Sequence, residues 1–193
     1  MKFIGFYDYT VILTYISLLS AFVGMCFSHQ GRFTAAILCL MVSGTCDAFD
    51  GTVARSKKNR TGDEKANGIQ LDSLCDVISF GVFPAFLCYC MGMDSIPGIL
   101  ILSAFCVCAV SRLAFFNVQE AKRQQMEEGA AKFYRGLPVT TISMLLPPFY
   151  LLRSILPAQI FVIALHILMA AVGFLFILDF RVRKRDLTKV FSK

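Results

Sequence analysis

Six apolar stretches separated by short polar segments constrain the fold of this chain more than any other feature of its sequence. Each is roughly 17–25 residues long, the length that a helix needs to cross the hydrocarbon core of a bilayer. The 193 residues are 56% hydrophobic and 17% charged, whereas a soluble domain is about a quarter charged. The sequence therefore predicts one all-α integral membrane domain with six transmembrane helices, at residues 10–28, 33–54, 69–93, 98–118, 136–152 and 157–180.

The polar segments set the expected connections between these spans. Residues 29–32 form a short turn, and residues 55–67 form a long charged loop. Residues 119–135 are rich in Gln, Glu, Lys and Ala, which are good helix formers, so this stretch is expected to prolong the fourth helix into water. The fifth span is short and interrupted by Pro138, Pro147 and Pro148, and a bend is expected there.

Lys and Arg are distributed unevenly among these connections. With six spans, the two termini and the loops after spans two and four share one side of the membrane. All of the 19 basic residues belong to that side except Arg32 and Arg153. By the positive-inside rule, both termini and the two long loops are cytoplasmic. This placement also accounts for the formal net charge of +6 without a nucleic-acid partner.

The eight cysteines fall mostly inside the apolar stretches. A free cysteine in such a stretch behaves as a small hydrophobe. No CxxC pair or Cys/His cluster has the spacing of zinc ligands. The cysteines therefore indicate neither a disulfide framework nor a zinc site.

Four aspartates in two pairs stand out within this apolar sequence. Asp47 and Asp50 are three residues apart near the end of the second span, and Asp72 and Asp76 are four apart near the start of the third. These spacings put each pair on one face of its helix. By the expected topology both pairs lie near the cytoplasmic surface, so two adjacent helices would gather four carboxylates in one cavity.

Such a cavity requires positive charge, because a carboxylate at membrane depth costs on the order of 3 kcal/mol even on lenient insertion scales. Salt bridges are one solution, but Arg55 and Arg112 are the only basic residues placed to form them, and two cations do not neutralise four anions. Divalent cations fit better, since Mg²⁺ and Mn²⁺ prefer oxygen ligands. Two such ions held by shared carboxylates commonly assist displacement at phosphorus. An ion transporter with intramembrane carboxylates remains an alternative.

The residues around the aspartates favour a phosphate ligand over simple ion transport. Gly51 directly follows Asp50, and Gly68 precedes Asp72 by one turn. Glycine is unfavourable in a helix by about 1 kcal/mol relative to alanine, and a close approach by a ligand would explain its presence. Arg55, one turn beyond Gly51, can bind a phosphate through its guanidinium group.

The complete pattern D-x2-D-G-x2-A-R … G-x3-D-x3-D resembles the signature of the CDP-alcohol phosphatidyltransferase family, which consists of membrane enzymes with six helices that usually pair as homodimers. All eight defining positions are present, namely Asp47, Asp50, Gly51, Ala54, Arg55, Gly68, Asp72 and Asp76. Twelve residues separate the arginine from the second glycine, against the eight usual in the family. The extra residues are expected within 62–67, in a polar loop where added length is tolerated.

The resemblance implies a role for each residue of the motif. Asp47, Asp50 and Asp72 would bind two divalent cations, Mg²⁺ or Mn²⁺. Asp76 would contact a metal and also act as the general base. The CDP part of the lipid donor would be bound by the remaining residues, Gly51, Arg55, Thr61 and Gly68.

Three further stretches resemble the phosphatidylserine synthase branch of this family: residues 70–85, 111–117 and 133–138. The resemblance implies transfer of a phosphatidyl group from CDP-diacylglycerol to L-serine, with release of CMP. Arg112, Arg135 and Ser79 are candidate serine-binding residues, because the serine carboxylate requires a nearby cation. Phe115 stands where that branch has a second arginine. The same chemistry on glycerol 3-phosphate or inositol remains an alternative.

Overall fold

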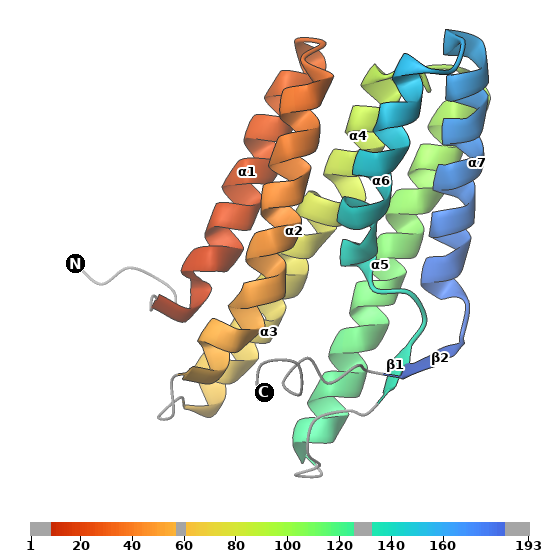
Figure 1. Cartoon of the computed structure of the whole chain (residues 1–193). Helices are drawn as coiled ribbons and strands as arrows, with labels where there is room; N and C mark the ends of the chain where they lie inside the picture. The colour runs from red at the N-terminus through yellow and green to blue at the C-terminus, as the bar shows by residue number, and fades with distance from the viewer. Residues whose placement is uncertain (1–8, 57–60, 126–132, 184–193) are drawn as a thin grey trace, which may run out of the picture.

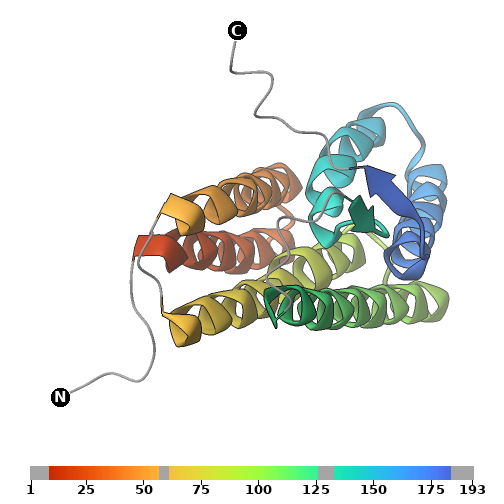
Figure 2. The same ribbon diagram turned by 90° about the horizontal axis from the view of Figure 1, so that it is seen from below.

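The computed structural model describes residues 9–56, 61–125 and 133–183, which form a bundle of helices running roughly alongside one another (Figure 1). Within this part of the chain, five helices are long and apolar enough to cross a membrane. Seen from one end, α1 lies between α2 and α3, and α6 and α7 lie on the other side of the bundle (Figure 2). The fold is that of a multi-pass integral membrane protein.

The first two expected spans form a helical hairpin. A short 3₁₀ turn leads into α1 (Ile12–His29), and α2 (Phe33–Ser56) follows. The turn at residues 30–32 is the one that the sequence predicts, and Gly31 adopts a positive φ of 72° in it. The buried residues of α1 are all small: Thr14, Ser17, Ala21, Gly24 and Ser28. Small residues let transmembrane helices approach closely, and they explain how α1 packs against α2 and α4.

The third span starts earlier than the sequence predicts. α3 (Gly62–Asp76), a π-helical segment (Val77–Val82) and α4 (Phe83–Cys90) follow one another as a single helical rod. Residues 62–67, expected to be a polar loop that holds the extra residues of the motif, are therefore helical. The reason is a capping box at residue 61 (described below with the site), which starts a helix ahead of the apolar stretch.

The fourth span continues into the polar stretch, as expected: α5 runs from Ile96 to Gln125. The all-α prediction is incomplete, because two short strands follow. β1 (Phe133–Arg135) pairs antiparallel with β2 (Arg181–Arg183), and Arg135 lies opposite Arg181. This pairing joins segments that are far apart in the sequence, so local periodicity gives no indication of it.

The residues next to β1 and β2 extend the contact between these two segments. Gly136 has a φ of 74°, and its N–H donates to the carbonyl of Phe180 over 2.7 Å. At the other strand, α7 (Ala158–Ile177) gives way to extended backbone at Leu178, with ψ of 124°. The sixth span therefore ends three residues before the predicted position at residue 180.

The fifth span is irregular, as its prolines predict, and its regular helix is shorter than the expected residues 136–152. The chain runs extended through Pro138, forms a 3₁₀ turn (Val139–Thr141), and only then enters α6 (Ile142–Leu151). Pro147 and Pro148 lie inside α6, and a second 3₁₀ turn follows it at once. Proline lacks an amide hydrogen and disturbs the helical ladder, which explains the short regular segment.

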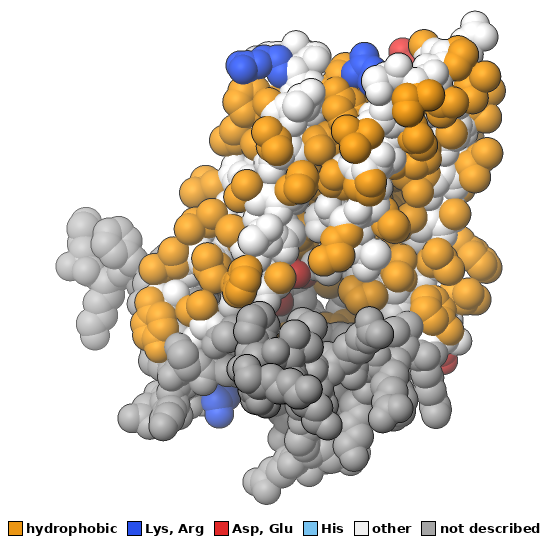
Figure 3. All heavy atoms as spheres, viewed as in Figure 1, with side chains coloured by type: hydrophobic (Ala, Val, Ile, Leu, Met, Phe, Trp, Pro, Cys, Tyr) orange, Lys and Arg blue, Asp and Glu red, His pale blue; other side chains and the backbone are white. Residues whose placement is uncertain are grey.

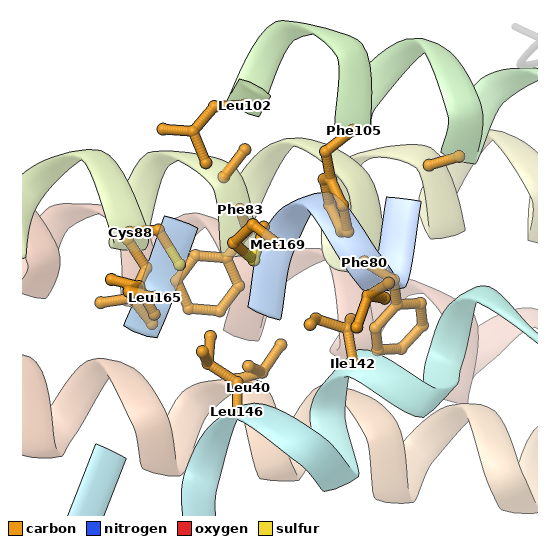
Figure 4. Close-up of a cluster of buried hydrophobic side chains, with 14 of the residues drawn as sticks. Leu40, Phe80, Phe83, Cys88, Leu102, Phe105, Ile142, Leu146, Leu165 and Met169 are labelled. Atoms are coloured by element: carbon orange, nitrogen blue, oxygen red, sulfur yellow. The ribbon is translucent and has the colours of Figure 1, made fainter. Parts of the chain in front are cut away.

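Buried side chains from nearly all of the helices form one core. Phe83 of α4, Phe105 of α5 and Met169 of α7 are fully buried there, with Leu40 and Leu146 reaching in from α2 and α6 (Figure 4). None of the four aspartates belongs to this core; α2 and α3 carry them.

Candidate active site

The two aspartate pairs meet between α2 and α3. One carboxylate oxygen from each of Asp47, Asp50 and Asp72 lies within 4.8 Å of the others. This confirms the predicted cluster for three of the four carboxylates, namely both members of the first pair and Asp72 of the second. The space-filling view shows acidic side chains recessed between α2 and α6 (Figure 3).

The carboxylates also pair across the two helices. Asp76 contacts Asp47 within hydrogen-bonding reach, and Asp72 contacts Asp50 in the same way. Asp76 is the most buried of the four, with 8% of its surface exposed. It lies beside the three-residue cluster and is joined to it through Asp47.

No lysine or arginine in the described part of the chain compensates the charge of Asp47, Asp72 or Asp76. Arg112 is directed elsewhere, since its Nε donates to the carbonyl of Leu137 over 3.3 Å. The salt-bridge alternative therefore fails for Arg112. The side chain of Arg55 lies outside the described residues.

The cluster fits a divalent metal ion. Asp72 Oδ1 is buried and accepts no hydrogen bond within the described structure. An unsatisfied buried oxygen on a carboxylate that clusters with two others is costly without a cation. An all-carboxylate donor set suits a hard ion such as Mg²⁺ or Mn²⁺.

The remaining residues of the expected CDP site lie at the ends of the same two helices. Gly51 is in α2 directly after Asp50, and Gly68 is in α3 one turn before Asp72; both are half-buried. Thr61 has an additional structural role as the N-cap of α3. Its hydroxyl accepts from the N–H of Glu64 over 3.2 Å, and the Glu64 carboxylate accepts from the N–H of Thr61 over 2.8 Å.

The expected serine-binding residues have hydrogen bonds to different elements. Ser79, in the π-helical segment, is fully buried and accepts from the hydroxyl of Ser17 over 3.4 Å. Arg112 has 9% of its surface exposed and holds the segment after β1. Arg135 belongs to β1, and its side chain lies outside the described residues. No contact in the described structure brings these three together.

The comparison with protein families identifies the chain. The profile described as CDP-alcohol phosphatidyltransferase matches residues 9–178, which include every described helix. The chain belongs to the CDP-alcohol phosphatidyltransferase family. It is therefore a member of a transferase family of phospholipid biosynthesis, and its cluster of Asp47, Asp50 and Asp72 is consistent with a divalent metal site typical of that family.

Curated members of the CDP-alcohol phosphatidyltransferase family resemble the chain at moderate identity. The CDP-diacylglycerol–serine O-phosphatidyltransferase of Saccharomyces cerevisiae is 40% identical over 58% of this chain and 40% of its own length. The archaetidylserine synthase of Methanothermobacter thermautotrophicus is 34% identical over 82% of this chain and 65% of its own. A CDP-diacylglycerol–serine O-phosphatidyltransferase of Methanocaldococcus jannaschii is 32% identical over 75% and 66%. The chain thus spans less than two thirds of the length of these relatives, and no solved structure matches it significantly.

Sequence reasoning missed two polar contacts around the cluster. Thr14 of α1 donates to Asp50 Oδ2 over 3.5 Å. Ser73, next to Asp72, donates to Asn117 Oδ1 over 2.7 Å and so links α3 to α5. Single hydroxyl residues in apolar helices usually bond to their own backbone, so the sequence offers little signal for such partners.

Proposed function

We propose that the chain transfers a phosphatidyl group from CDP-diacylglycerol to the hydroxyl of L-serine, giving phosphatidylserine and CMP. The observation that carries this proposal is the convergence of Asp47, Asp50 and Asp72 within a membrane-embedded member of the CDP-alcohol phosphatidyltransferase family. The donor carries its pyrophosphate at the membrane surface, where a carboxylate–metal site near the end of a span can meet it.

On the donor side, Asp47, Asp50 and Asp72, together with Asp76, would hold two divalent cations. When bound, such ions neutralise the pyrophosphate and the charge that develops on the departing CMP. Gly51, Gly68 and Arg55 would bind the nucleotide part, since the two glycines leave room for a close approach and an arginine can bind phosphate through its guanidinium group. Thr61 would contribute from the start of α3, in addition to its capping role.

On the acceptor side, Asp76 would act as the general base. It would take the proton of the serine hydroxyl as that oxygen forms its bond to the lipid-side phosphorus and the bond from phosphorus to CMP breaks. Asp76 suits this role because it lies next to the three-carboxylate cluster without being one of its three members. A carboxylate in that position can accept a proton in the transition state.

Serine is supported as the acceptor by the names of the relatives. Two of those described above are named for serine and CDP-diacylglycerol, and the third for archaetidylserine. The named lipids differ, whereas serine is common to all three. Arg112, Arg135 and Ser79 are the proposed serine-binding residues, with a guanidinium group for the carboxylate. We also propose a homodimer whose active sites face the cytoplasm.

The deciding experiment is an acceptor competition with purified protein. The protein is incubated with CDP-diacylglycerol, Mn²⁺ or Mg²⁺, and labelled serine, and labelled lipid is extracted and counted. We expect phosphatidylserine, with little loss of label when unlabelled glycerol 3-phosphate or inositol is added in excess. Transfer to one of those alcohols in place of serine would reassign the acceptor. Metal flux across vesicles without any lipid turnover would instead favour the transporter alternative.

A further inference from the structure

Thr14 places a hydroxyl group where the apolar span of α1 faces the aspartate cluster. Its side chain is 6% exposed, and within the described residues its hydroxyl has one partner, Asp50 Oδ2, at 3.5 Å. Ser28 and Thr45 behave differently, since they donate to carbonyls four residues earlier in their own helices. Thr14 therefore forgoes the usual bond within its own helix for a contact across to α2.

The position of Thr14 is held by a second set of contacts one turn further along α1. Ser43 Oγ of α2 donates to the carbonyl of Ser17 over 2.8 Å, and Ser17 Oγ in turn lies 3.3 Å from the carbonyl of Ser43. Ser17 Oγ also lies 3.4 Å from Ser79 Oγ, just beyond Asp76. Both helices that carry aspartates are thus tied to the same face of α1. A threonine side chain has few χ1 rotamers in a helix, and in the structure Thr14 adopts one that directs its hydroxyl at Asp50.

We propose that Thr14 is a positioning residue that orients the Asp50 carboxylate toward the divalent cation. The inference rests on the proposed metal-binding function of the cluster. A carboxylate ligand binds a metal more tightly when an outer hydrogen bond fixes its orientation, and loss of such a bond typically lowers metal affinity by about 10–100-fold. Thr14 lies outside the family motif, so α1 contributes to the site without supplying a ligand.

The test measures Mn²⁺ binding directly, by the electron paramagnetic resonance signal of free Mn²⁺ in titrations of purified protein. Thr14→Val removes the hydroxyl at nearly constant volume, and Thr14→Ser retains it. Thr45→Val makes the same change on an exposed hydroxyl that bonds within its own helix. We expect roughly tenfold weaker Mn²⁺ binding for Thr14→Val and wild-type binding for Thr14→Ser and Thr45→Val, all with similar melting temperatures.

An Asp50→Asn variant distinguishes the metal-binding role of Asp50 from the positioning role of Thr14. If Asp50→Asn weakens Mn²⁺ binding while Thr14→Val binds as the wild type does, the positioning role of Thr14 is overturned and the metal site stands. If Asp50→Asn also binds Mn²⁺ as the wild type does, the proposed metal function of Asp50 fails, and the role of Thr14 fails with it. Loss of binding in both Thr14→Val and Thr14→Ser would overturn the role of the hydroxyl and indicate a packing effect.

Discussion

Asp76 differs from the other three aspartates in ways that bear on its chemistry. It is buried, contacts Asp47, and lies outside the group whose oxygens converge within 4.8 Å. The three carboxylates inside that group are placed chiefly to bind metal. Asp76 lies beside the group, where one of its oxygens can receive a proton. The two roles can be separated by substitutions that keep the size of the side chain.

Asp76→Asn is predicted to lower kcat by about 10²–10⁴-fold, the usual contribution of a general base, while Mn²⁺ binding weakens less than it does in Asp72→Asn. Asp72→Asn is predicted to weaken Mn²⁺ binding, because it changes an oxygen of the convergent cluster. The measurements are serine-transfer kinetics and Mn²⁺ titration on the same preparations. Asp94→Asn, on an exposed loop residue, is the matched control and should change neither quantity. Full turnover by Asp76→Asn would rule out its role as the base.

Gly24 makes the close packing of α1 and α4 possible. A Cβ at this position would collide with Cζ of the fully buried Phe83. Gly24→Ala is therefore predicted to destabilise the protein by about 1–3 kcal/mol, the usual cost of overpacking a core. Thermal unfolding in detergent measures the effect. Gly62→Ala, with no atom within 4 Å of the added Cβ, is the control and should melt at or above the wild-type temperature; equal melting temperatures for both variants would contradict this packing.

The aspartate cluster could be predicted from the sequence because it depends on helical spacing. Residues three or four apart lie on one face of a helix, so the spacings on two neighbouring helices determine which side chains meet. The contact of Thr14 with Asp50 could not, because it depends on the rotation of α1 about its own axis. That rotation is set by small buried residues such as Gly24, whose importance shows only when the partner side chain is known. For the same reason, Arg112 could be identified as buried but not as a partner of Leu137.

At the scale of the elements, the start of α3 depends on the capping box of Thr61 and Glu64. Thr61→Ala is predicted to destabilise the first turn of α3 by about 1 kcal/mol, because one helical N–H loses its acceptor. Thr61→Asp retains an acceptor at the cap and should preserve stability. Circular dichroism and thermal unfolding give the comparison.

Activity then tests whether Thr61 also binds the nucleotide. A carboxylate added beside a pyrophosphate repels it. If Thr61 contacts the nucleotide as proposed, Thr61→Asp should raise the KM for CDP-diacylglycerol at unchanged stability. Wild-type KM in a stable Thr61→Asp variant would restrict Thr61 to its capping role.

The elements that sequence reasoning placed wrongly share a physical cause. Residues 62–67 are polar, and hydropathy alone does not distinguish a polar helix from a loop. The pairing of β1 with β2 depends on segments more than forty residues apart. The entry into α6 runs through Gly136, which has a positive φ directly after β1, and Pro138, where the chain is extended. Long, apolar, uninterrupted helices such as α1 and α7 were predicted closely, because length and composition suffice for them.

At the scale of the whole molecule, the aspartate cluster and the β1–β2 pair lie in the same half of the bundle, in the lower part of Figure 1. The turn between α1 and α2, which carries Arg32, lies at the other end. By the positive-inside rule, the Lys and Arg distribution predicts that the first of these halves faces the cytoplasm. The proposed reaction agrees with that assignment, since free serine and CDP-activated lipid would both meet the cluster from that side.

This orientation predicts the behaviour of reporter fusions. A green fluorescent protein fused after Lys193 should fluoresce in cells, because it folds to the fluorescent form in the cytoplasm. Alkaline phosphatase inserted at Gly31, in the turn between α1 and α2, should be active, because that enzyme requires an oxidising compartment across the membrane. The reciprocal fusions, with the two reporters exchanged, should both be silent. An active phosphatase after Lys193 would invert the topology, and the aspartate cluster would then face away from the compartment in which serine is free.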